Sequence, residues 1–413
     1  MVTKTNILVY AHWKGMSKPK KMGVLQAVFS RGKTSYSFEY DKQWLLSEEH
    51  LLIDPDIQWY SGIQFPSHGN FGIFLDSMPD TWGRTLMKRR AILNKMGANF
   101  TPLHEIDYLL GVYDEARMGA LRFKLEEKGD FLSNENKYPI PPWSSVRELQ
   151  YGANIAESDK DEEETRKWLT ILIAPGSSLG GARPKANILD TDKQLWIAKF
   201  PSKNDDIDKA LWEYLSYRLA KKAGIIMAES KVEKVAGKYH TFFTKRFDRD
   251  KNERIHFASA MTMLGKNEQI LRDEPASYLD IAEFIQFHCD ENEKDLHQLW
   301  RRIVFNICIS NTDDHLRNHG FLLQAKSWRL SPAYDLNPSI DKNGLSLNID
   351  SENNALSIEL AKNVGHYFML DSLKMDKIIT EVTAAIRNWK AIAKEIGIPR
   401  KEQTLMAAAF RCE

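Results

Sequence analysis

The stretch SNTDDHLRNHG at residues 310–320 gathers polar side chains between an apolar helical pattern (residues 293–309) and an apolar strand pattern (residues 319–323). A loop between two core elements is a common place for catalytic residues. In protein kinases, a catalytic aspartate and a magnesium-binding asparagine stand five positions apart in such a loop. Asp313 and Asn318 have this separation. The stretch therefore predicts a site for phosphoryl transfer.

A second segment supports this interpretation. Asp335 lies in LSPAYDL (residues 330–336), just after a short strand that would form a hairpin with the strand at 319–323. A carboxylate there could bind magnesium between two phosphates, as the aspartate of the kinase Asp-Phe-Gly segment does. The alternative is a polar hairpin closed by Asx turns, the usual role of Asp and Asn in loops. The presence of Asp313, Asn318 and Asp335 together favours the catalytic interpretation.

The two histidines of the same stretch allow a different metal site. His315 and His319, with nearby aspartates, could bind a catalytic zinc or iron ion. Zinc-binding pairs with this spacing usually lie on one helix face, whereas His319 begins a strand pattern. We therefore expect His315 to line a nucleotide site and His319 to have a structural role.

Upstream, the stretch APGSSLGGARPK at residues 174–185 could surround phosphates, because glycines let backbone N–H groups approach anionic oxygens. It matches neither G-x-G-x-x-G nor the Walker pattern, and a plain flexible turn is an equally good interpretation. The candidate phosphate-binding residues are Ser178, Gly180, Gly181 and Lys185.

Lys199 interrupts an otherwise apolar strand pattern at residues 194–200. A buried ammonium group without a partner costs several kcal/mol, so we expect an acidic partner. Glu213, in a helical pattern at 207–222, could form the strand-lysine to helix-glutamate pair of kinases. The alternative is an edge-strand lysine that points to solvent.

Strand patterns open the chain and helical patterns close it. Residues 7–13, 22–29 and 35–40 are short and rich in β-branched and aromatic residues, whereas the chain after Gly265 is mainly helical. We expect an α+β fold with a small N-terminal β-rich subdomain and a helical C-terminal lobe. The expected parts are a first subdomain (1–125), a connector (126–145), a nucleotide-binding part (146–255) and a catalytic lobe (256–413).

Composition excludes several classes of protein. Lysine and arginine (57) nearly balance aspartate and glutamate (56) over 413 residues, so net charge alone gives little affinity for nucleic acid. The apolar runs are shorter than the roughly 20 residues of a membrane span, and the N-terminus lacks a secretory-signal pattern. Three cysteines without CxxC spacing favour neither a disulfide framework nor a zinc site. We expect a folded, cytoplasmic protein.

Over essentially its whole length the chain resembles the HipA family, the kinase toxins of type II toxin–antitoxin modules. The matching motifs are SLGGARPKA (178–186), NTDDHLRN (311–318), SPAYD (331–335), KRFDR (245–249) and LDSMPDTWGR (75–84). Two residues depart from the family pattern. Lys245 replaces the usual acidic residue before Arg-Phe-Asp-Arg, and Thr81 replaces a glycine in the N-terminal motif.

The resemblance implies a bilobed, atypical protein-kinase-like fold that uses ATP and Mg²⁺. It also implies roles for individual residues: Asp313 as catalytic base, Asn318 and Asp335 as magnesium ligands, Lys199 at the α- and β-phosphates, the backbone of Arg246 and Phe247 at adenine, and Asp248, His315 and Tyr334 as further residues lining the nucleotide. Ser178 corresponds to a serine that such kinases can autophosphorylate, which would add negative charge to the phosphate loop.

The function implied by the resemblance is a serine/threonine kinase toxin that phosphorylates an aminoacyl-tRNA synthetase, such as glutamate–tRNA ligase, and causes growth arrest and persistence. A small helix-turn-helix antitoxin is the implied partner, and DNA would be bound only through it. The alternative is a HipA-like scaffold that serves as a transcriptional corepressor without kinase activity. Such a scaffold would not need Asp313, Asn318, Asp335 and Lys199 together, and all four are present.

Overall fold

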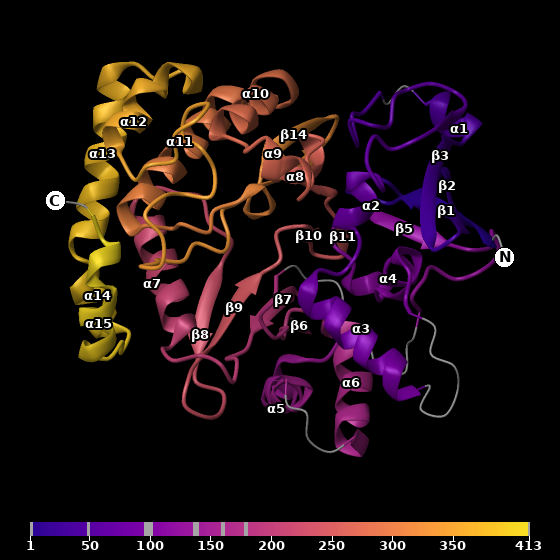
Figure 1. Ribbon diagram of the computed structural model, residues 1–413, viewed down its shortest axis with the longest axis horizontal. Coiled ribbons are helices and arrows are strands. Elements are labelled where there is room, and N and C mark those ends of the chain that lie inside the picture. Colours follow the sequence, from indigo (N-terminus) through magenta and orange to yellow (C-terminus); the bar gives the residue numbers. More distant parts are fainter. Residues whose placement is uncertain are drawn as a thin grey trace. The chain divides into compact units, whose positions relative to one another are not determined.

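A computed structural model describes residues 3–47, 50–94, 102–134, 140–157, 162–176 and 181–411 (Figure 1). The chain divides into two compact units. The first unit comprises Met1–Asn204 and Lys245–Ala258, and the second comprises Asp205–Thr244 and Ser259–Glu413. The predicted α+β fold is confirmed, with strands first and helices later. The predicted division into four consecutive parts stays a prediction.

An antiparallel sheet forms the start of the first unit. Along its strand β1, Ile7, Val9 and Ala11 are fully buried and alternate with more exposed residues, as expected when one face of a sheet covers a core. The Phe38 ring on the sheet lies 5.8 Å from the Phe74 ring. The strand order is β4-β3-β2-β1-β5, with the bounds β1 Thr3–Ala11, β2 Lys20–Ser30, β3 Lys33–Tyr40, β4 Ile63–Gln64 and β5 Leu121–Lys124.

Helices and a second hairpin complete the first unit. Helix α3 (Thr81–Asn94) packs against α6 (Glu162–Gly176), and Figure 1 shows the two side by side. Gly152 lets α5 approach α6, because a Cβ atom there would lie 2.5 Å from the Trp168 ring. The other bounds are α1 Lys42–Leu45, α2 Gly72–Asp76, α4 Glu105–Gly111, η1 Asp114–Ala116, η2 Trp143–Ser145, α5 Val146–Glu157, β6 Lys185–Leu189, β7 Leu195–Lys199, β10 Arg249–Asp250 and β11 Glu253–Arg254.

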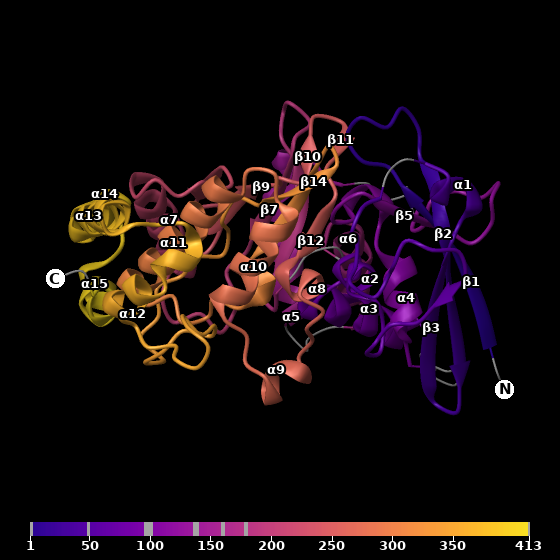
Figure 2. The same ribbon diagram turned by 90° about the horizontal axis from the view of Figure 1, so that it is seen from above.

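The second unit is built around helix α11 (Asn292–Ile309). Its residues Leu296, Leu299 and Ile303 are fully buried at helical spacing. Helices α10 (Tyr278–His288) and α13 (Ser372–Arg387) both pack against α11, as Figures 1 and 2 show. The predicted helical C-terminal part is confirmed.

Shorter elements of the second unit surround these helices. They are α7 Lys209–Lys222, β8 Ser230–Glu233, β9 Thr241–Lys245, α8 Ala260–Met263, α9 Ile270–Asp273, η3 Leu316–Asn318, β13 Gly320–Gln324, β14 Ser327–Leu330, α12 Ile358–Asn363, η4 Gly365–Phe368, α14 Trp389–Glu395, α15 Arg400–Met406 and η5 Ala407–Ala409; β12 Phe257–Ser259 and the end of β9 lie at the boundaries of the units. Among the helices described, none has the length and apolar composition to cross a bilayer.

A buried histidine makes the stability of the first unit depend on pH. His256 is 1% exposed and stacks on Trp13, with ring centroids 5.5 Å apart. Burial lowers the pKa of His256 to about 3. The unfolded chain therefore binds more protons than the folded chain between about pH 3 and the ordinary histidine value of about 6.5. Stability should be complete above this window and be lost as the pH falls through it.

Replacing His256 with Phe should remove this part of the pH dependence. Between pH 7.5 and 5.5 the natural protein should lose about 1.4 kcal/mol more unfolding free energy than His256→Phe, since one pKa unit corresponds to about 1.4 kcal/mol. Urea unfolding at the two pH values measures the difference. His68→Phe, at an exposed histidine, is the control and should keep the natural pH dependence. Equal pH dependence in His256→Phe and the natural protein would contradict this role of His256.

Candidate active site

The polar stretch at residues 310–320 leaves helix α11 through a sharp turn. Ser310 follows the last residue of α11 and has a left-handed conformation with a φ of 51°. This conformation costs roughly 1–2 kcal/mol for a residue with a side chain, so the surroundings must hold it. The Ser310 hydroxyl donates to the carbonyl of Ala409 (2.8 Å), and the Ser310 carbonyl accepts from the N–H of Ser339 (3.1 Å). The loop is thus fixed where it begins.

Asp314 anchors the middle of the loop. Its side chain is 1% exposed, and Oδ2 accepts hydrogen bonds from the Tyr278 hydroxyl (2.6 Å), Asn306 Nδ2 (2.8 Å) and His319 Nε2 (2.8 Å). Burial alone would raise the pKa of Asp314, but His319 and Tyr278 hold this pKa below its ordinary value. Asp314 is held in the interior, whereas the adjacent Asp313 is exposed. The anchor therefore leaves Asp313 accessible to a substrate.

Asn318 closes the loop onto Asp313. It ends the short helix η3 and is 9% exposed. Its Nδ2 donates to the backbone carbonyl of Asp313 (3.0 Å), and its own N–H donates to the carbonyl of His315 (2.8 Å). Because Nδ2 is the donor in this bond, Oδ1 is the side-chain atom of Asn318 that could bind a metal ion. The structure brings together the two residues that the sequence places five positions apart.

The segment that leads to Asp335 is tied down by its backbone. The N–H of Ser331 donates to the carbonyl of Gly320 (2.8 Å), and the buried Arg302 donates to the carbonyl of Ser331 (2.5 Å). Two residues further on, the N–H of Ala333 donates to the carbonyl of Ile226 (2.8 Å). The position of this segment is therefore set by the start of strand β13, by helix α11 and by the chain after α7.

Asp335 has a left-handed backbone with a φ of 58°. Non-glycine residues in this region are uncommon and are often found at functional sites. Its Oδ1 accepts a hydrogen bond from Asn337 Nδ2 (3.1 Å). The preceding Tyr334 donates its hydroxyl hydrogen bond to the carbonyl of Arg317 (2.7 Å), next to Asn318. This bond links the Asp335 segment to the loop that carries Asp313.

The histidines of this region do not form a paired metal site. His319 Nε2 is bonded to the carboxylate of Asp314, and its side chain is 2% exposed, whereas His315 is partly exposed at the start of η3. Within the residues that the structure describes, no group of three or more His, Cys, Asp or Glu side chains is arranged to hold a metal ion. Asn318 and Asp335 instead offer amide and carboxylate oxygens, which are suitable ligands for Mg²⁺.

In the first unit, two lysines face each other across a hairpin. Strands β6 and β7 are antiparallel, and Lys185 lies directly opposite Lys199. Residues in this relation project from the same face of the sheet, and like charges there are unfavourable. Lys185 is only 6% exposed and Lys199 is partly buried. Both lysines could contribute positive charge to a phosphate-binding site on this face of the hairpin.

Of the predicted phosphate loop, the structure describes the last part, which begins at Gly181. Gly181 has a left-handed backbone with a φ of 84°. Its N–H donates to Asp80 Oδ2 (2.7 Å), and its carbonyl accepts from the N–H of Trp82 (3.2 Å). The Trp82 indole N–H donates to the carbonyl of Lys185 (2.9 Å). Residues 181–185 are therefore bound to the start of helix α3, a connection that the sequence analysis did not identify.

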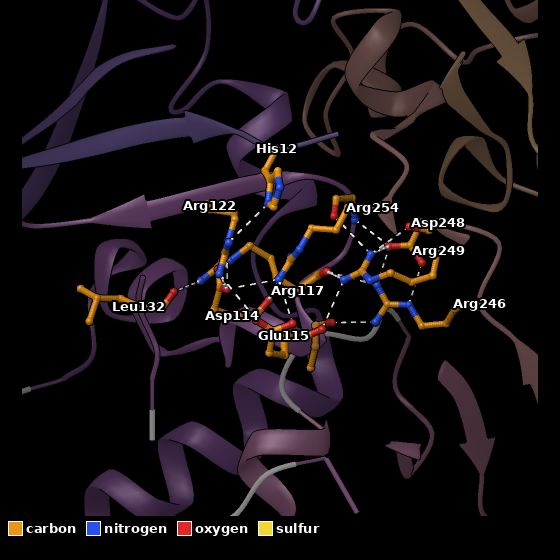
Figure 3. A network of polar contacts seen from close by, with 12 residues as sticks. His12, Asp114, Glu115, Arg117, Arg122, Leu132, Arg246, Asp248, Arg249 and Arg254 are labelled. Atoms are coloured by element: carbon orange, nitrogen blue, oxygen red, sulfur yellow. Dashed lines mark hydrogen bonds and ion pairs between the residues drawn. The ribbon is translucent and has the colours of Figure 1, made fainter. Parts of the chain in front are cut away.

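The Arg-Phe-Asp-Arg segment forms a buried ion network in the first unit (Figure 3). Asp248 has no exposed surface and accepts hydrogen bonds from Arg246 Nη2 (2.6 Å), Arg249 Nη1 (2.6 Å) and the N–H of Gly119 (2.8 Å). Burial alone would raise the pKa of Asp248, but Arg246 and Arg249 hold it well below its usual range. The predicted nucleotide contact of Arg246 and Phe247 through their backbone stays a prediction. The Asp248 carboxylate itself is fully enclosed.

The same network includes the loop before strand β5. Asp114 Oδ2 pairs with Arg122 Nη2 (2.5 Å) and Arg254 Nη2 (3.1 Å), and Arg246 Nη1 donates to the carbonyl of Ala116 (2.6 Å). Figure 3 shows these side chains converging with Arg117 and Arg249. The network joins residues 114–122 to residues 246–254. Its position indicates that the charged residues of this motif hold the first unit together.

Some of the predicted site residues are not placed together by the structure. Ser178 and Gly180 lie outside the described residues. Lys199 belongs to the first unit, whereas Glu213 is a buried residue of α7 in the second unit. The predicted Lys199–Glu213 ion pair, and a nucleotide site that uses both units, therefore stay predictions.

Known proteins are similar to this chain, among them a curated relative and two solved structures. The chain is 30% identical over 179 residues to a Haemophilus influenzae protein named "Putative kinase", and the match covers 39% of this chain and 52% of that protein. A Shewanella oneidensis HipA structure, from a complex of HipA, HipB and operator DNA, shares the fold with a TM-score of 0.67 at 18% identity; the match covers 98% of this chain and 94% of that chain. The Helicobacter pylori proinflammatory kinase CtkA matches with a TM-score of 0.34 at 12% identity, over 52% of this chain and 95% of that chain.

The family comparison concerns the part of the chain that contains the candidate site. The family model of the HipA-like C-terminal domain matches residues 177–390. This range is more than half of the 413 residues and includes Lys199, Asp313, Asn318 and Asp335. The predicted relationship is thus confirmed, and the chain belongs to the HipA-like family.

Proposed function

We propose that this protein is an ATP- and Mg²⁺-dependent serine/threonine protein kinase that acts as the toxin of a toxin–antitoxin module. The observation that carries the proposal is the arrangement of Asp313, Asn318 and Asp335. Asp313 is exposed, Asn318 is bonded to its backbone, and Asp335 is held in a left-handed conformation next to a tyrosine that contacts the same loop. A polar hairpin that only closes a turn would not require an exposed carboxylate in a loop to which both Asn318 and Tyr334 are bonded.

In the proposed reaction, Asp313 accepts the proton of a serine or threonine hydroxyl on the substrate. The hydroxyl oxygen then bonds to the γ-phosphorus of ATP, the bond from that phosphorus to the β-phosphate oxygen breaks, and ADP leaves. Asn318 and Asp335 would hold Mg²⁺, which supplies neutralisation of the phosphate charge. Lys185 and Lys199 support the binding of phosphates by their positive charge and their position on one face of the hairpin.

The proposed partners follow from the family and from the relatives. The similar Shewanella structure is a complex of HipA with HipB and operator DNA, which supports a small helix-turn-helix antitoxin as the partner here, with DNA bound through it. We further propose an aminoacyl-tRNA synthetase, such as glutamate–tRNA ligase, as the phosphorylated protein and growth arrest as the result. A corepressor without kinase activity is the alternative, and it predicts that no phosphate is transferred.

The reaction is tested by incubating the purified protein with γ-labelled ATP, a bacterial lysate and purified glutamate–tRNA ligase. Label should be incorporated into protein in reactions that contain Mg²⁺. Incorporation should not occur when EDTA is present in excess, and it should be restored when Mg²⁺ exceeds EDTA. Peptide mapping of the labelled kinase tests autophosphorylation, and an unmodified Ser178 would contradict that part. Absence of labelling in every reaction with Mg²⁺ would favour the corepressor.

Asp335→Asn should raise the Mg²⁺ concentration needed for half-maximal transfer by about tenfold or more, because it replaces a charged ligand by a neutral one. Asparagine tolerates the left-handed backbone and can still accept the hydrogen bond from Asn337 at Oδ1. Asp341→Asn, at an exposed carboxylate of the same unit, is the control and should leave the Mg²⁺ titration unchanged. An unchanged titration in Asp335→Asn would remove Asp335 from the proposed metal site.

A further inference from the structure

The start of helix α3 and the end of the predicted phosphate loop satisfy each other's backbone groups. The first N–H groups of a helix have no partner within the helix, and here the N–H of Trp82 donates to the carbonyl of Gly181 (3.2 Å). In return, Asp80 Oδ2 accepts from the N–H of Gly181 (2.7 Å), while its Oδ1 accepts from the N–H of Thr81 (2.7 Å). Both peptide groups that meet at Gly181 are therefore fixed by residues about a hundred positions earlier.

A second contact from helix α3 fixes the backbone of Lys185. Trp82 is 4% exposed, and its indole N–H donates to the carbonyl of Lys185 (2.9 Å). On the other side, the N–H of Phe200 donates to the carbonyl of Pro184 (2.8 Å). The backbone at residues 184 and 185 is thus held between α3 and the end of strand β7. The Lys185 ammonium group also lies close to Gly181, since a Cβ atom there would be 2.7 Å from Nζ.

Helix α3 supports the chain before the loop as well. It packs along α6, the helix whose last residues, up to Gly176, form the start of the predicted phosphate-binding stretch at 174–185 (Figure 1). One helix therefore contacts the element that enters the loop and binds the residues that leave it. A phosphate-binding loop needs backbone N–H groups and a lysine in a fixed arrangement, and α3 supplies a support for both ends.

We propose that Asp80 and Trp82 are positioning residues of the nucleotide site, which set the geometry of Gly181 and Lys185 for phosphate binding. This inference rests on the proposed function. Neither side chain needs to touch ATP: Asp80 acts through the Gly181 peptide, and Trp82 acts through the backbone of Lys185. Loss of these bonds should weaken nucleotide binding more than it slows the transfer step, because Asp313 lies on a different unit.

Two substitutions distinguish a positioning role of Asp80 and Trp82 from a role in folding. In Asp80→Asn, Oδ1 can still accept from Thr81, but the amide group would place a donor against the N–H of Gly181. Trp82→Phe keeps an aromatic ring in the buried position and removes the N–H that binds the Lys185 carbonyl. The control is Asp107→Asn, because Asp107 Oδ2 accepts from the N–H of His104 (2.7 Å) at the start of α4. It removes a similar helix-start carboxylate in the same unit.

The test measures the dissociation constant of a non-hydrolysable ATP analogue with Mg²⁺ by calorimetry on the full chain, and hydrogen exchange of residues 181–189 without nucleotide. A hydrogen bond to a charged group contributes enough for about a tenfold effect or more. Asp80→Asn should weaken analogue binding by about that factor and speed exchange at Gly181. Trp82→Phe should weaken binding in the same direction, and Asp107→Asn should change neither quantity.

The outcomes distinguish this inference from the function on which it rests. Unchanged analogue binding in Asp80→Asn, with the natural protein binding normally, would overturn the positioning role and leave the kinase proposal intact. Equal weakening in Asp107→Asn would also overturn it, because the effect would then reflect general destabilisation. Failure of the natural protein to bind the analogue would overturn the proposed function, and this inference with it.

Discussion

Replacement of Asp313 by Asn should lower the rate of phosphoryl transfer by about a hundred- to ten-thousandfold, the usual contribution of a general base. The amide cannot accept the proton of the substrate hydroxyl. The bond from Asn318 to the loop should survive, since it reaches the backbone carbonyl of residue 313 and not its side chain. Asp313 is exposed, so the substitution should have little effect on folding. Transfer from γ-labelled ATP under single-turnover conditions measures the rate.

Asp376→Asn is a suitable control for this experiment. Asp376 is an exposed residue of α13 in the same unit, and it pairs with Lys362 at the surface (3.1 Å). Its substitution makes the same chemical change and should leave transfer unchanged. Nucleotide binding should be retained in both variants. Transfer by Asp313→Asn within about threefold of the natural rate would rule out Asp313 as the base, since a general base contributes far more than this.

Asp248→Asn should destabilise the first unit by about 3–5 kcal/mol, because removal of one partner from a buried ion network leaves uncompensated charge. The carboxylate is bonded to Arg246, Arg249 and the N–H of Gly119 without exposed surface. Its neutral replacement would leave two buried guanidinium groups without their anion. Hydrogen exchange of peptides from residues 114–124 and 246–254 measures the loss of protection in this unit separately from the rest of the chain.

The matched control for Asp248 lies two residues further along the chain. Asp250 pairs with Lys14 at the surface (2.5 Å), and exposed pairs of this kind contribute little. Asp250→Asn should therefore leave exchange in the first unit unchanged. The same variants also test the predicted role of Asp248 at the nucleotide. Weaker ATP binding in Asp248→Asn with natural exchange protection would contradict the structural role described above.

The loop at residues 310–320 could be predicted from the sequence because its signals are local. The apolar periodicity of residues 293–309, the polar stretch after it and the short strands that follow lie within about forty residues, and the structure forms these elements. Asp313 and Asn318 are five positions apart and are joined by one hydrogen bond. Local spacing sufficed to predict that these two residues lie together, whereas their roles stay predictions.

Other parts of the site depend on contacts between distant residues, which spacing does not reveal. Asp314 could not be recognised as the anchor of the loop, because Tyr278 lies 36 positions before it. The bond between Asp80 and Gly181 joins residues 101 positions apart. The Arg-Phe-Asp-Arg motif indicated a nucleotide contact by resemblance, whereas its charged side chains meet residues 114–122, about 130 positions earlier. A charged motif in sequence does not distinguish ligand binding from a buried ion network.

The first unit is built from two separate segments of the chain, which has a consequence for folding during translation. Residues 245–258 complete the first unit, but residues 205–244, which precede them, belong to the second. During translation, Arg246, Asp248 and Arg254 are synthesised only after residues 205–244 of the second unit. The buried ion network of the first unit cannot be complete before then. Domains usually fold in order as they emerge, whereas the first unit of this chain can be completed only after part of the second has been made. Release of the chain before residue 254 would leave Asp114 without one of its two arginine partners.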